Sequence, residues 1–357
     1  MKRIGMLTSG GDCQALNAVM YAFAKAYCNL EDDVVFYGFI DGYYGLMHNK
    51  YRKMKLKDFD NIDELGGTIL GSSRQPFKMM EVIEDGFDKV KAMVDTYKKN
   101  ELDALIVLGG NGSLKSANLL ASKGCNVIGM PKTIDNDTWG TDVTFGFQSS
   151  VNIAATAVDQ VRTTAASHHR IFVVELMGHK VGWITLYGGI AGKADMILLP
   201  EIPYDPDVVL KTVKKAMKNG KDTYIIACAE GALTKKEAKM KKKARAAARE
   251  ASPYKSAAEE ITAMLKENTD KYVGLTVVGH TQRGGRPCTF DKEISYLIGA
   301  KGAMLCKEKD FGKMVSLTNQ HITAVPLEEI AGKLKFIEPE GDTVTCARAL
   351  GVSFGDK

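Results

Sequence analysis

Short apolar runs of strand length recur along the chain, and each is continuous rather than alternating. The runs are Ile4 to Leu7, Val34 to Ile40, Ala104 to Leu108, Val127 to Met130, Ile171 to Leu176, Met196 to Leu199, Tyr224 to Cys228 and Val273 to Val278. Such runs are typical of strands that are covered on both faces. Segments with helical spacing lie between them, namely Leu16 to Tyr27, Phe87 to Lys98, Leu114 to Lys123, Val151 to Thr164 and Val208 to Lys218. This alternation predicts an α/β protein with doubly wound, mostly parallel sheets.

The chain has 357 residues, of which 45% are hydrophobic and 25% are charged, an ordinary composition for a folded protein. A single hydrophobic core stops growing at roughly 250 to 300 residues. We therefore expect two lobes, although composition marks the boundary between them poorly. Disordered chains, collagen and miniprotein scaffolds are excluded.

The formal net charge of +5 is local rather than spread over the chain. The segment from Lys235 to Glu250 holds eight Lys or Arg and two Glu, so everything else carries about one negative charge. A broad nucleic-acid footprint is therefore not expected. We interpret Leu233 to Lys255 as a solvated helix inserted after a strand, with a phosphate-binding or partner-docking role as the alternative.

Seven cysteines are spread along the chain, without a CxxC pair or a histidine cluster at zinc-ligand spacing. This pattern favours reduced thiols in a cytoplasmic protein. The N-terminal region has no apolar signal segment, and no run of about 18 apolar residues occurs. We expect a cytoplasmic protein that is neither exported nor membrane-spanning.

Polar or glycine-rich clusters follow many of the predicted strands. They are TSGGD at 8–12, GGNGS at 109–113, PKTIDND at 131–137, MGHK at 177–180 and GHTQRGG at 279–285. In an open parallel sheet, the ligand crevice lies at the carboxyl ends of the strands. A binding site built from these clusters is therefore the default expectation.

Two of these clusters suit phosphate. Ser9 to Asp12 and Gly109 to Ser113 each join a strand to a helix, so backbone N–H groups at the helix N-terminus could meet an anion. Turn geometry alone explains such glycines equally well. Neither cluster matches the dinucleotide fingerprint or a Walker A loop, which disfavours a nicotinamide oxidoreductase.

The stretch from Pro131 to Asp137 is the most unusual, because it places two carboxylates, a hydroxyl and an ammonium after a buried strand. If it is extended, Thr133, Asp135 and Asp137 share one face. One carboxylate could then act as a base while another meets a metal ion. An Asx-rich turn is the structural alternative. Single residues at other strand ends, such as His179 and Glu230, are more often structural than functional.

The sequence resembles the phosphofructokinase family from Met1 to about Gly332. The resemblance lies in ordered motifs: LTSGGD at 7–12, DGYYGL at 41–46, GGTILGSSR at 66–74, GGNGS, PKTIDND, SHHRIFVVELMG at 167–178 and GHTQRGGRP at 279–287. The GGNGS, Lys132 and MGHK variants are most similar to the mixed-substrate branch, group III. The resemblance implies two similar lobes. Residues 1–146 with about 282–325 would bind the phosphoryl donor, and residues 147–281 with about 326–357 would bind the sugar phosphate.

The implied reaction is transfer of a phosphoryl group from ATP to the 1-hydroxyl of fructose 6-phosphate, giving fructose 1,6-bisphosphate in glycolysis, with Mg²⁺. Pyrophosphate as donor, or a weakly active phosphosugar or nucleotide sensor, remain as alternatives. The resemblance also leaves open whether a longer ketose phosphate is accepted.

The resemblance assigns roles by position. Donor-site residues would be Gly11, Tyr43, Arg74, Lys78, Gly112, Ser113 and Lys132. Asp135 would take the proton from the sugar hydroxyl, with Thr133 and Asp137 beside it. The sugar phosphate would be held by Arg170, Met177, Gly178, His179, Glu230, His280 and Arg283. Arg170 would reach in from a neighbouring subunit, which implies a homodimer or homotetramer.

Some positions depart from the family pattern. Asn111 stands where an Asp usually helps to hold Mg²⁺, His179 replaces an Arg, and Gly274 replaces a second Arg expected to reach the sugar 6-phosphate; these three motivate the sensor alternative. Gly112 leaves room for the α-phosphate of ATP, whereas Lys132 favours pyrophosphate. We weigh the steric argument more heavily and expect ATP.

Overall fold

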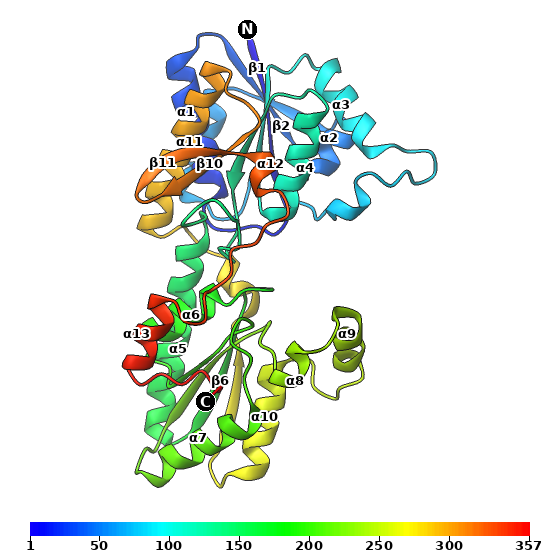
Figure 1. Cartoon of the computed structure of the whole chain (residues 1–357). Helices are drawn as coiled ribbons and strands as arrows, with labels where there is room; N and C mark the ends of the chain where they lie inside the picture. The colour runs from blue at the N-terminus through cyan, green and yellow to red at the C-terminus, as the bar shows by residue number, and fades with distance from the viewer. The chain divides into compact units, whose positions relative to one another are not determined.

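The computed structural model describes residues 1–357, which form two compact units. The first unit comprises Met1–Ser149 and Arg283–Lys335, and the second comprises Ser150–Gln282 and Phe336–Lys357. Each unit is therefore assembled from segments that are far apart in the sequence (Figure 1). No helix is both long enough and apolar enough to span a membrane, and all seven cysteine side chains are free.

The first unit holds a seven-stranded mixed sheet in the order β11-β10-β5-β4-β1-β2-β3. Its strands are β1 (Lys2–Ser9), β2 (Val34–Phe39), β3 (Tyr51–Met54), β4 (Ala104–Gly109), β5 (Val127–Pro131), β10 (Lys313–Thr318) and β11 (His321–Pro326). The five central strands are parallel, and the two edge strands, β3 and β11, pair antiparallel. Strands β1, β4 and β5 are buried for most of their length, as their continuous apolar sequences predict.

Helices cover both faces of this sheet (Figure 1). They are α1 (Leu16–Leu30), α2 (Tyr43–Met47), α3 (Lys89–Lys99), α4 (Asn111–Ser122), α11 (Thr289–Glu308) and α12 (Leu327–Ile330), with 3-10 turns at Leu56–Phe59, Ile62–Glu64 and Phe77–Met79. Helix α1 packs against α11 on one face. On the other face, α2, α3, α4 and α12 pack their apolar side chains against the sheet in one hydrophobic cluster.

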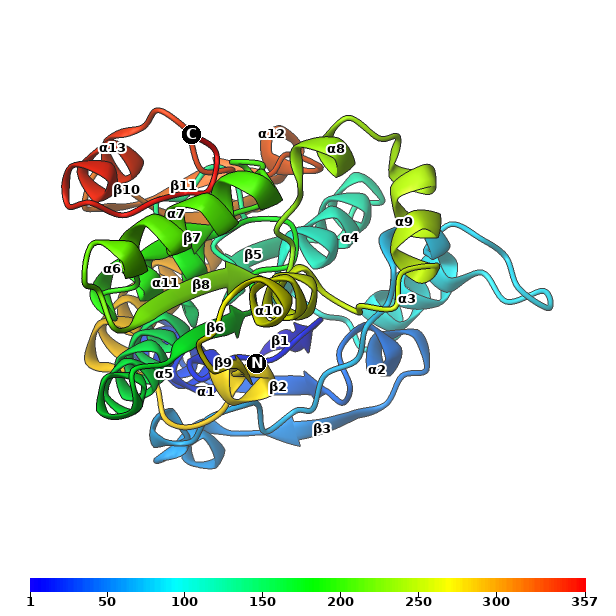
Figure 2. The same ribbon diagram turned by 90° about the horizontal axis from the view of Figure 1, so that it is seen from below.

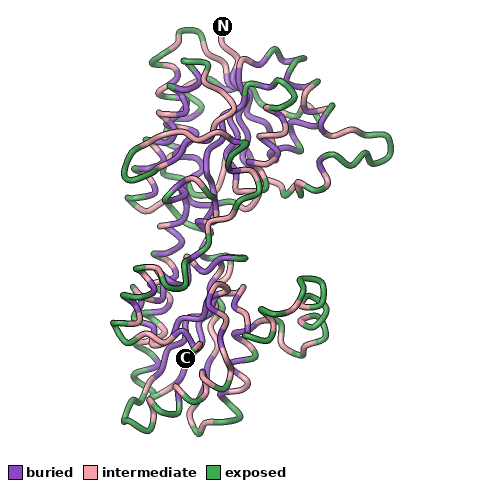
Figure 3. Tube along the Cα trace, viewed as in Figure 1, coloured by how far each residue is buried: buried purple, intermediate pink, exposed green.

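The second unit holds a four-stranded parallel sheet in the order β7-β8-β6-β9. Its elements are α5 (Phe147–His168), β6 (Ile171–Leu176), α6 (Trp183–Ala191), β7 (Met196–Leu198), α7 (Pro206–Lys218), β8 (Tyr224–Ala229), α8 (Lys235–Ala238), α9 (Lys242–Glu250), α10 (Ala257–Asn268), β9 (Val273–Val277), a 3-10 turn at Gly279–Arg283, and α13 (Asp342–Ala349). The start of α5, up to Ser149, and the last residue of the 3-10 turn, Arg283, belong to the first unit. Helices α7 and α10 share a core with the strands. Buried strands contrast with exposed helical surfaces in both units (Figure 3).

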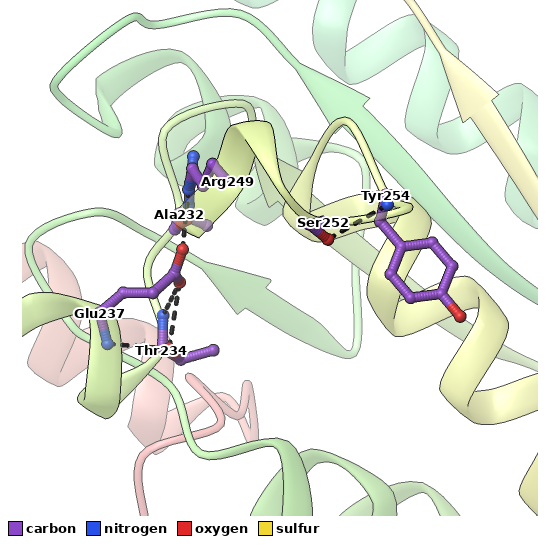
Figure 4. A network of polar contacts seen from close by, with 6 residues as sticks. All are labelled: Ala232, Thr234, Glu237, Arg249, Ser252 and Tyr254. Atoms are coloured by element: carbon purple, nitrogen blue, oxygen red, sulfur yellow. Dashed lines mark hydrogen bonds and ion pairs between the residues drawn. The ribbon is translucent and has the colours of Figure 1, made fainter. Parts of the chain in front are cut away.

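The basic segment 233–255 folds as two short helices rather than the single helix that its composition predicted. Helix α8 ends at Ala238 and α9 begins at Lys242. The capping box of Thr234 and Glu237 starts α8, while Arg249 reaches back from α9 to Glu237, at 2.7 Å, and to the carbonyl of Ala232, at 2.6 Å (Figure 4). These hydrogen bonds fold α9 back toward the start of α8. Helix α9 has no buried residue and stands away from the sheet of its unit (Figure 2).

A buried carboxylate on α11 starts helix α5. Asp291 is fully buried, and its Oδ2 accepts hydrogen bonds from the backbone N–H and the hydroxyl of Ser149, both at 2.6 Å. The Ser149 hydroxyl in turn accepts from the N–H of Cys288 at 2.9 Å. One buried Asp therefore satisfies donors in the first turn of α5, where no intrahelical acceptor exists.

We expect Asp291→Ala to lower the free energy of unfolding by about 2 to 3 kcal/mol, because it leaves buried donors without an acceptor. In a unit of this size that corresponds to a fall of roughly 5 to 10 °C in the thermal midpoint, measured by circular dichroism or calorimetry. Asp95→Ala is the control, because Asp95 is exposed and pairs only across the surface with Lys91, so its midpoint should barely move. Equal midpoints for the two variants would contradict the prediction.

Candidate active site

Three of the predicted clusters begin side by side at one edge of the first sheet. Strands β1, β4 and β5 are adjacent and parallel, and Ser9 pairs with Gly109, which in turn pairs with Pro131. The turns that follow these residues therefore leave the sheet at the same level. This register brings Ser9 to Asp12, Gly110 to Ser113 and Lys132 to Asp137 together at the carboxyl ends of the strands.

Gly10, in the first turn, lets side chains of the other two turns come close to its backbone. Gly10 has φ +87°, a conformation that side chains disfavour, and a Cβ placed on it would lie 3.5 Å from Nζ of Lys132 and 3.7 Å from Oγ of Ser113. Nζ of Lys132 donates a hydrogen bond to the carbonyl of Gly11. The three turns thus contact one another through Gly10, Gly11, Ser113 and Lys132.

Lys132 is buried, with 3% of its surface exposed. Burial lowers the pKa of its ammonium from the ordinary value, while the nearby carboxylates Asp135 and Asp137 oppose that shift. Lys132 therefore places a positive charge beneath the turns, close to both carboxylates. Such a charge suits an incoming phosphate better than a solvated surface lysine does.

Helix α4 begins directly at the second turn, at Asn111, three residues before the predicted start. Its first N–H groups point toward the carboxyl edge of the sheet, where an anion would be favoured. Tyr43 is fully buried and donates from its hydroxyl to the carbonyl of Ser113 at 2.7 Å. Tyr43 thus supports the start of α4 from within the protein, and burial raises the pKa of its hydroxyl.

Arg74 and Lys78 are exposed, as groups that meet a ligand from solvent would be. The residues before Arg74 are tied to the first turn: the hydroxyl of Ser72 donates to the carbonyl of Gly10 at 2.6 Å, and the N–H of Gly10 donates to the carbonyl of Ser73 at 3.2 Å. Arg74 is therefore anchored beside the glycine turn. Sequence reasoning missed Ser72, although it lies within the motif at 66–74.

The loop after β5 is bent, so the extended conformation in which Thr133, Asp135 and Asp137 would share one face is not the one observed. The hydroxyl of Thr133 accepts a hydrogen bond from the N–H of Asp135 at 3.0 Å, and Asn136 has φ +54°. A local side-chain acceptor replaces a strand partner, as is usual in ST turns. Thr133 is buried, whereas Asp135 and Asp137 are partly exposed. Oδ1 of Asp135 is itself buried, so its carboxylate is exposed only in part, and Thr133 is committed to the turn.

Arg283 lies in the first unit, beside the glycine turn. Its guanidinium donates to the carbonyl of Asp12 at 2.9 Å, and a Cβ on Gly11 would lie 2.7 Å from its Nη1. All the other residues that the resemblance assigns to the sugar phosphate, outside the loop after β5, belong to the second unit. Arg283 therefore sits with the donor turns, and a side chain at Gly11 would displace it.

In the second unit, a carboxylate organises the turn after β6. Oε1 of Glu230, at the end of β8, accepts from the N–H groups of Gly178 and His179, at 3.3 and 2.7 Å. The N–H of Met177 donates to Oε1 of Gln282 at 3.0 Å. Sequence reasoning missed Gln282, which is fully buried inside the motif at 279–285. His179 and His280 are exposed at this edge of the sheet.

Arg170 lies at the opposite end of the second sheet. It precedes β6, whereas Met177 follows it, and a six-residue strand spans roughly 20 Å. Its guanidinium stacks over the ring of Tyr272 at 4.4 Å. Gly274 pairs with Phe172, and a Cβ there would lie 2.3 Å from that ring. Aromatic side chains therefore fill the space where the family would place a second Arg.

The residues near Asn111 fit a magnesium ion that arrives with phosphates better than a resident ion. No group of three His, Cys, Asp or Glu side chains in the structure could hold a metal by itself. The amide of Asn111 donates to the carbonyl of Lys333, which leaves its oxygen as an acceptor. Mg²⁺ commonly uses one or two protein oxygens together with substrate phosphates and water.

The sequence model of the family described as Phosphofructokinase matches residues 3–306. This chain belongs to the phosphofructokinase family. It is 44% identical to the ATP-dependent 6-phosphofructokinase of Spirochaeta thermophila, over 99% of this chain and 98% of that protein. It is 40% identical to ATP-dependent 6-phosphofructokinase 3 of Bacteroides thetaiotaomicron, over 99% of this chain and 100% of that protein.

Solved phosphofructokinases share the fold. A pyrophosphate-dependent phosphofructokinase from Marinobacter aquaeolei superposes with a TM-score of 0.81 at 20% identity, covering 98% of this chain and 91% of that one. The phosphofructokinase from Saccharomyces cerevisiae gives a TM-score of 0.78 at 27% identity. The match covers 93% of this chain but 45% of the yeast chain, so this chain spans less than half its length. The predicted two-lobed α/β fold of this family is confirmed.

Proposed function

We propose that the chain transfers the terminal phosphoryl group of ATP to the 1-hydroxyl of fructose 6-phosphate, giving fructose 1,6-bisphosphate in glycolysis. The observation that carries the proposal is the register of the parallel strands β1, β4 and β5. Their carboxyl ends lie at the same level, which brings the glycine turns, Lys132 and two carboxylates to one edge of a sheet. The names of the two curated relatives support the same reaction. The first unit would bind the donor and the second the sugar phosphate.

Phosphoryl transfer asks the protein mainly to position reactants and to neutralise charge. Lys132 and Arg74 would neutralise charge on the moving group, while the turns at Gly11, Gly112 and Ser113 would hold donor phosphates with backbone N–H groups. Asp135 would accept the proton of the sugar hydroxyl. A carboxylate suffices as the base, because in a loose transition state the proton leaves late.

The proposal includes Mg²⁺ bound through the donor phosphates, with Asn111 and the carboxylates of Asp12 or Asp137 as protein oxygens. Bound there, the ion would neutralise charge on the phosphates in transfer. The chain's own part is to hold these oxygens at the carboxyl edge of the first sheet. The exposed position of Asp12 and the partly exposed position of Asp137 suit that role.

ATP is the favoured donor because the surface at Gly112 is open. A Cβ on Gly112 would meet nothing within 4 Å, so the space directly beside this residue is open. Pyrophosphate is the second candidate. The buried ammonium of Lys132, bonded to the Gly11 carbonyl, would suit a compact, highly charged donor.

The position of Arg170 supports an oligomer. Within its own chain, Arg170 lies at the end of the second sheet away from the Met177 turn. If it binds the sugar phosphate, it must do so at the site of another chain. We therefore propose a homodimer or homotetramer in which Arg170 completes a neighbouring site.

A coupled assay of fructose 1,6-bisphosphate formation tests the proposal, with fructose 6-phosphate held fixed and ATP or pyrophosphate varied in the presence of Mg²⁺. We expect turnover with ATP to exceed that with pyrophosphate. Higher turnover with pyrophosphate would reverse the donor assignment. Turnover with neither donor would overturn the enzyme proposal and leave the sensor alternative, which ligand binding without turnover would support.

A further inference from the structure

A short segment at the end of the first unit, here called the strap, contacts two parts of the candidate site. One is Asn111 at the start of α4, and the other is the loop after β5, which carries Asp135 and Asp137. The strap is Lys333 to Lys335, and it lies beyond the residues that the family model matches. Its Leu334 forms an antiparallel bridge with Thr138, and the N–H of Lys335 donates to the carbonyl of Asp137 at 2.9 Å. The carbonyl of Lys333 accepts from the amide of Asn111.

The ammonium of Lys335 binds the loop that follows Asp135. It donates to Oδ1 of Asn136 at 2.9 Å, to the carbonyl of Thr141 at 2.8 Å and to the carbonyl of Asp142 at 2.7 Å. A lysine ammonium has three N–H donors, and here three oxygens of one loop accept them. The loop 136–142 is therefore closed around a single cation.

The conformation of Asn136 depends on these contacts. Asn136 separates the two carboxylates, Asp135 and Asp137, and has φ +54°, a left-handed conformation that Asn adopts more readily than most non-glycine residues. Its Oδ1 also accepts from the N–H of Thr144 at 3.1 Å. Three oxygens carrying partial negative charge repel one another unless a cation lies between them. The Lys335 ammonium thus maintains the bend that sets the directions of Asp135 and Asp137.

We propose that Lys335 is a positioning residue for phosphoryl transfer, whose ammonium holds loop 136–142 and through it the carboxylates of Asp135 and Asp137. This inference rests on the proposed function, because it assigns Lys335 a part in the same reaction. Lys335 acts through the loop and makes no contact with substrate in this role. The resemblance to the family gives no hint of it, since the strap lies outside every motif.

The experiment compares Lys335→Met, Lys335→Arg and, as a matched control, Lys313→Met in the full-length protein. Lys313 lies at the start of β10 and pairs with Asp310 on the surface. We expect Lys335→Met to lower kcat roughly 30- to 100-fold with KM values within about threefold, as small displacements of reacting groups do. Lys313→Met should stay within about twofold. Lys335→Arg, which keeps the positive charge, should recover much of kcat.

Two outcomes would overturn the proposal. One is an unchanged kcat in Lys335→Met, and the other is a fall of the same size in Lys313→Met, which would show that the loss is not specific to Lys335. Hydrogen exchange of residues 136–145 gives a readout that needs no turnover. It should accelerate in Lys335→Met and not in Lys313→Met, even if the wild type turns over with neither donor. Unchanged exchange in an active enzyme would refute the strap while leaving the proposed function intact.

Discussion

Asp135→Asn should lower kcat for fructose 6-phosphate phosphorylation by about 10³-fold while KM for both substrates changes little. The substitution removes the base and keeps the shape of the side chain, and general bases typically contribute about 10²- to 10⁴-fold. A base acts mainly in the transition state, so the loss falls on kcat rather than on ground-state binding. The hydrogen bond from the Asp135 N–H to the Thr133 hydroxyl does not involve the Asp135 side chain and survives the change.

The measurement is steady-state kinetics with ATP and Mg²⁺, together with the thermal midpoint of each variant. Asp310→Asn serves as the control, because it neutralises a carboxylate of the same unit that pairs with Lys313 on the surface. It should keep kcat within about twofold. If Asp135→Asn retains the wild-type kcat, another group takes the proton, and Asp137 becomes the next residue to test.

Gly112→Asp should lower kcat/KM for ATP by at least about 100-fold and affect pyrophosphate much less. Two unit charges about 4 Å apart repel by about 4 kcal/mol at an effective dielectric constant of 20. Because about 1.4 kcal/mol corresponds to a factor of ten, that repulsion is more than enough for the expected loss. Pyrophosphate has no α-phosphate to meet the new carboxylate.

The fold should tolerate this substitution. A Cβ on Gly112 meets nothing within 4 Å, and Gly112 lies in the first turn of α4, where an acidic side chain is favoured by the helix dipole. Gly112→Asn has the same shape without the charge and is the matched control, with an expected loss of less than about tenfold for ATP. Equal losses for Asp and Asn would show that bulk rather than charge decides. Equal losses with ATP and pyrophosphate would remove Gly112 from the donor site.

The central strands were predictable because burial on both faces demands apolar residues throughout. The eight apolar runs correspond to β1, β2 and β4 to β9. Strands β3, β10 and β11 were not predicted. Strand β3 carries Arg52 and Lys53 on an exposed edge, and β10 and β11 form a hairpin whose turn, Asn319 and Gln320, has positive φ at both residues. Edge strands such as β3 and β11 are stabilised by pairing more than by burial, so their sequences carry a weaker signal. Strand β10 is an interior strand in which Met314 and Val315 are buried, but Ser316 interrupts its apolar run.

The composition of the site was predictable, but its local conformation was not. Parallel strands present their carboxyl ends at one edge, which is why turns separated by about a hundred residues could be grouped from sequence. The bend at Asp135 depends on a hydroxyl two residues away, and the left-handed Asn136 depends on Lys335, nearly two hundred residues later. The hydrophobic periodicity of a sequence does not predict such individual side-chain hydrogen bonds.

By itself, the sequence determined the α/β architecture, the edge of the sheet where chemistry gathers, and the kinds of side chain there, because hydrophobic period and turn residues are local properties. Only the tertiary structure decided which side chains contact one another in the site. It placed Arg283 against the Gly11 turn, Arg170 at the far end of β6, and Lys335 under the loop that carries the carboxylates. Those assignments depend on contacts between residues distant in the chain, and the free energy of such contacts exists only once the sheets have formed.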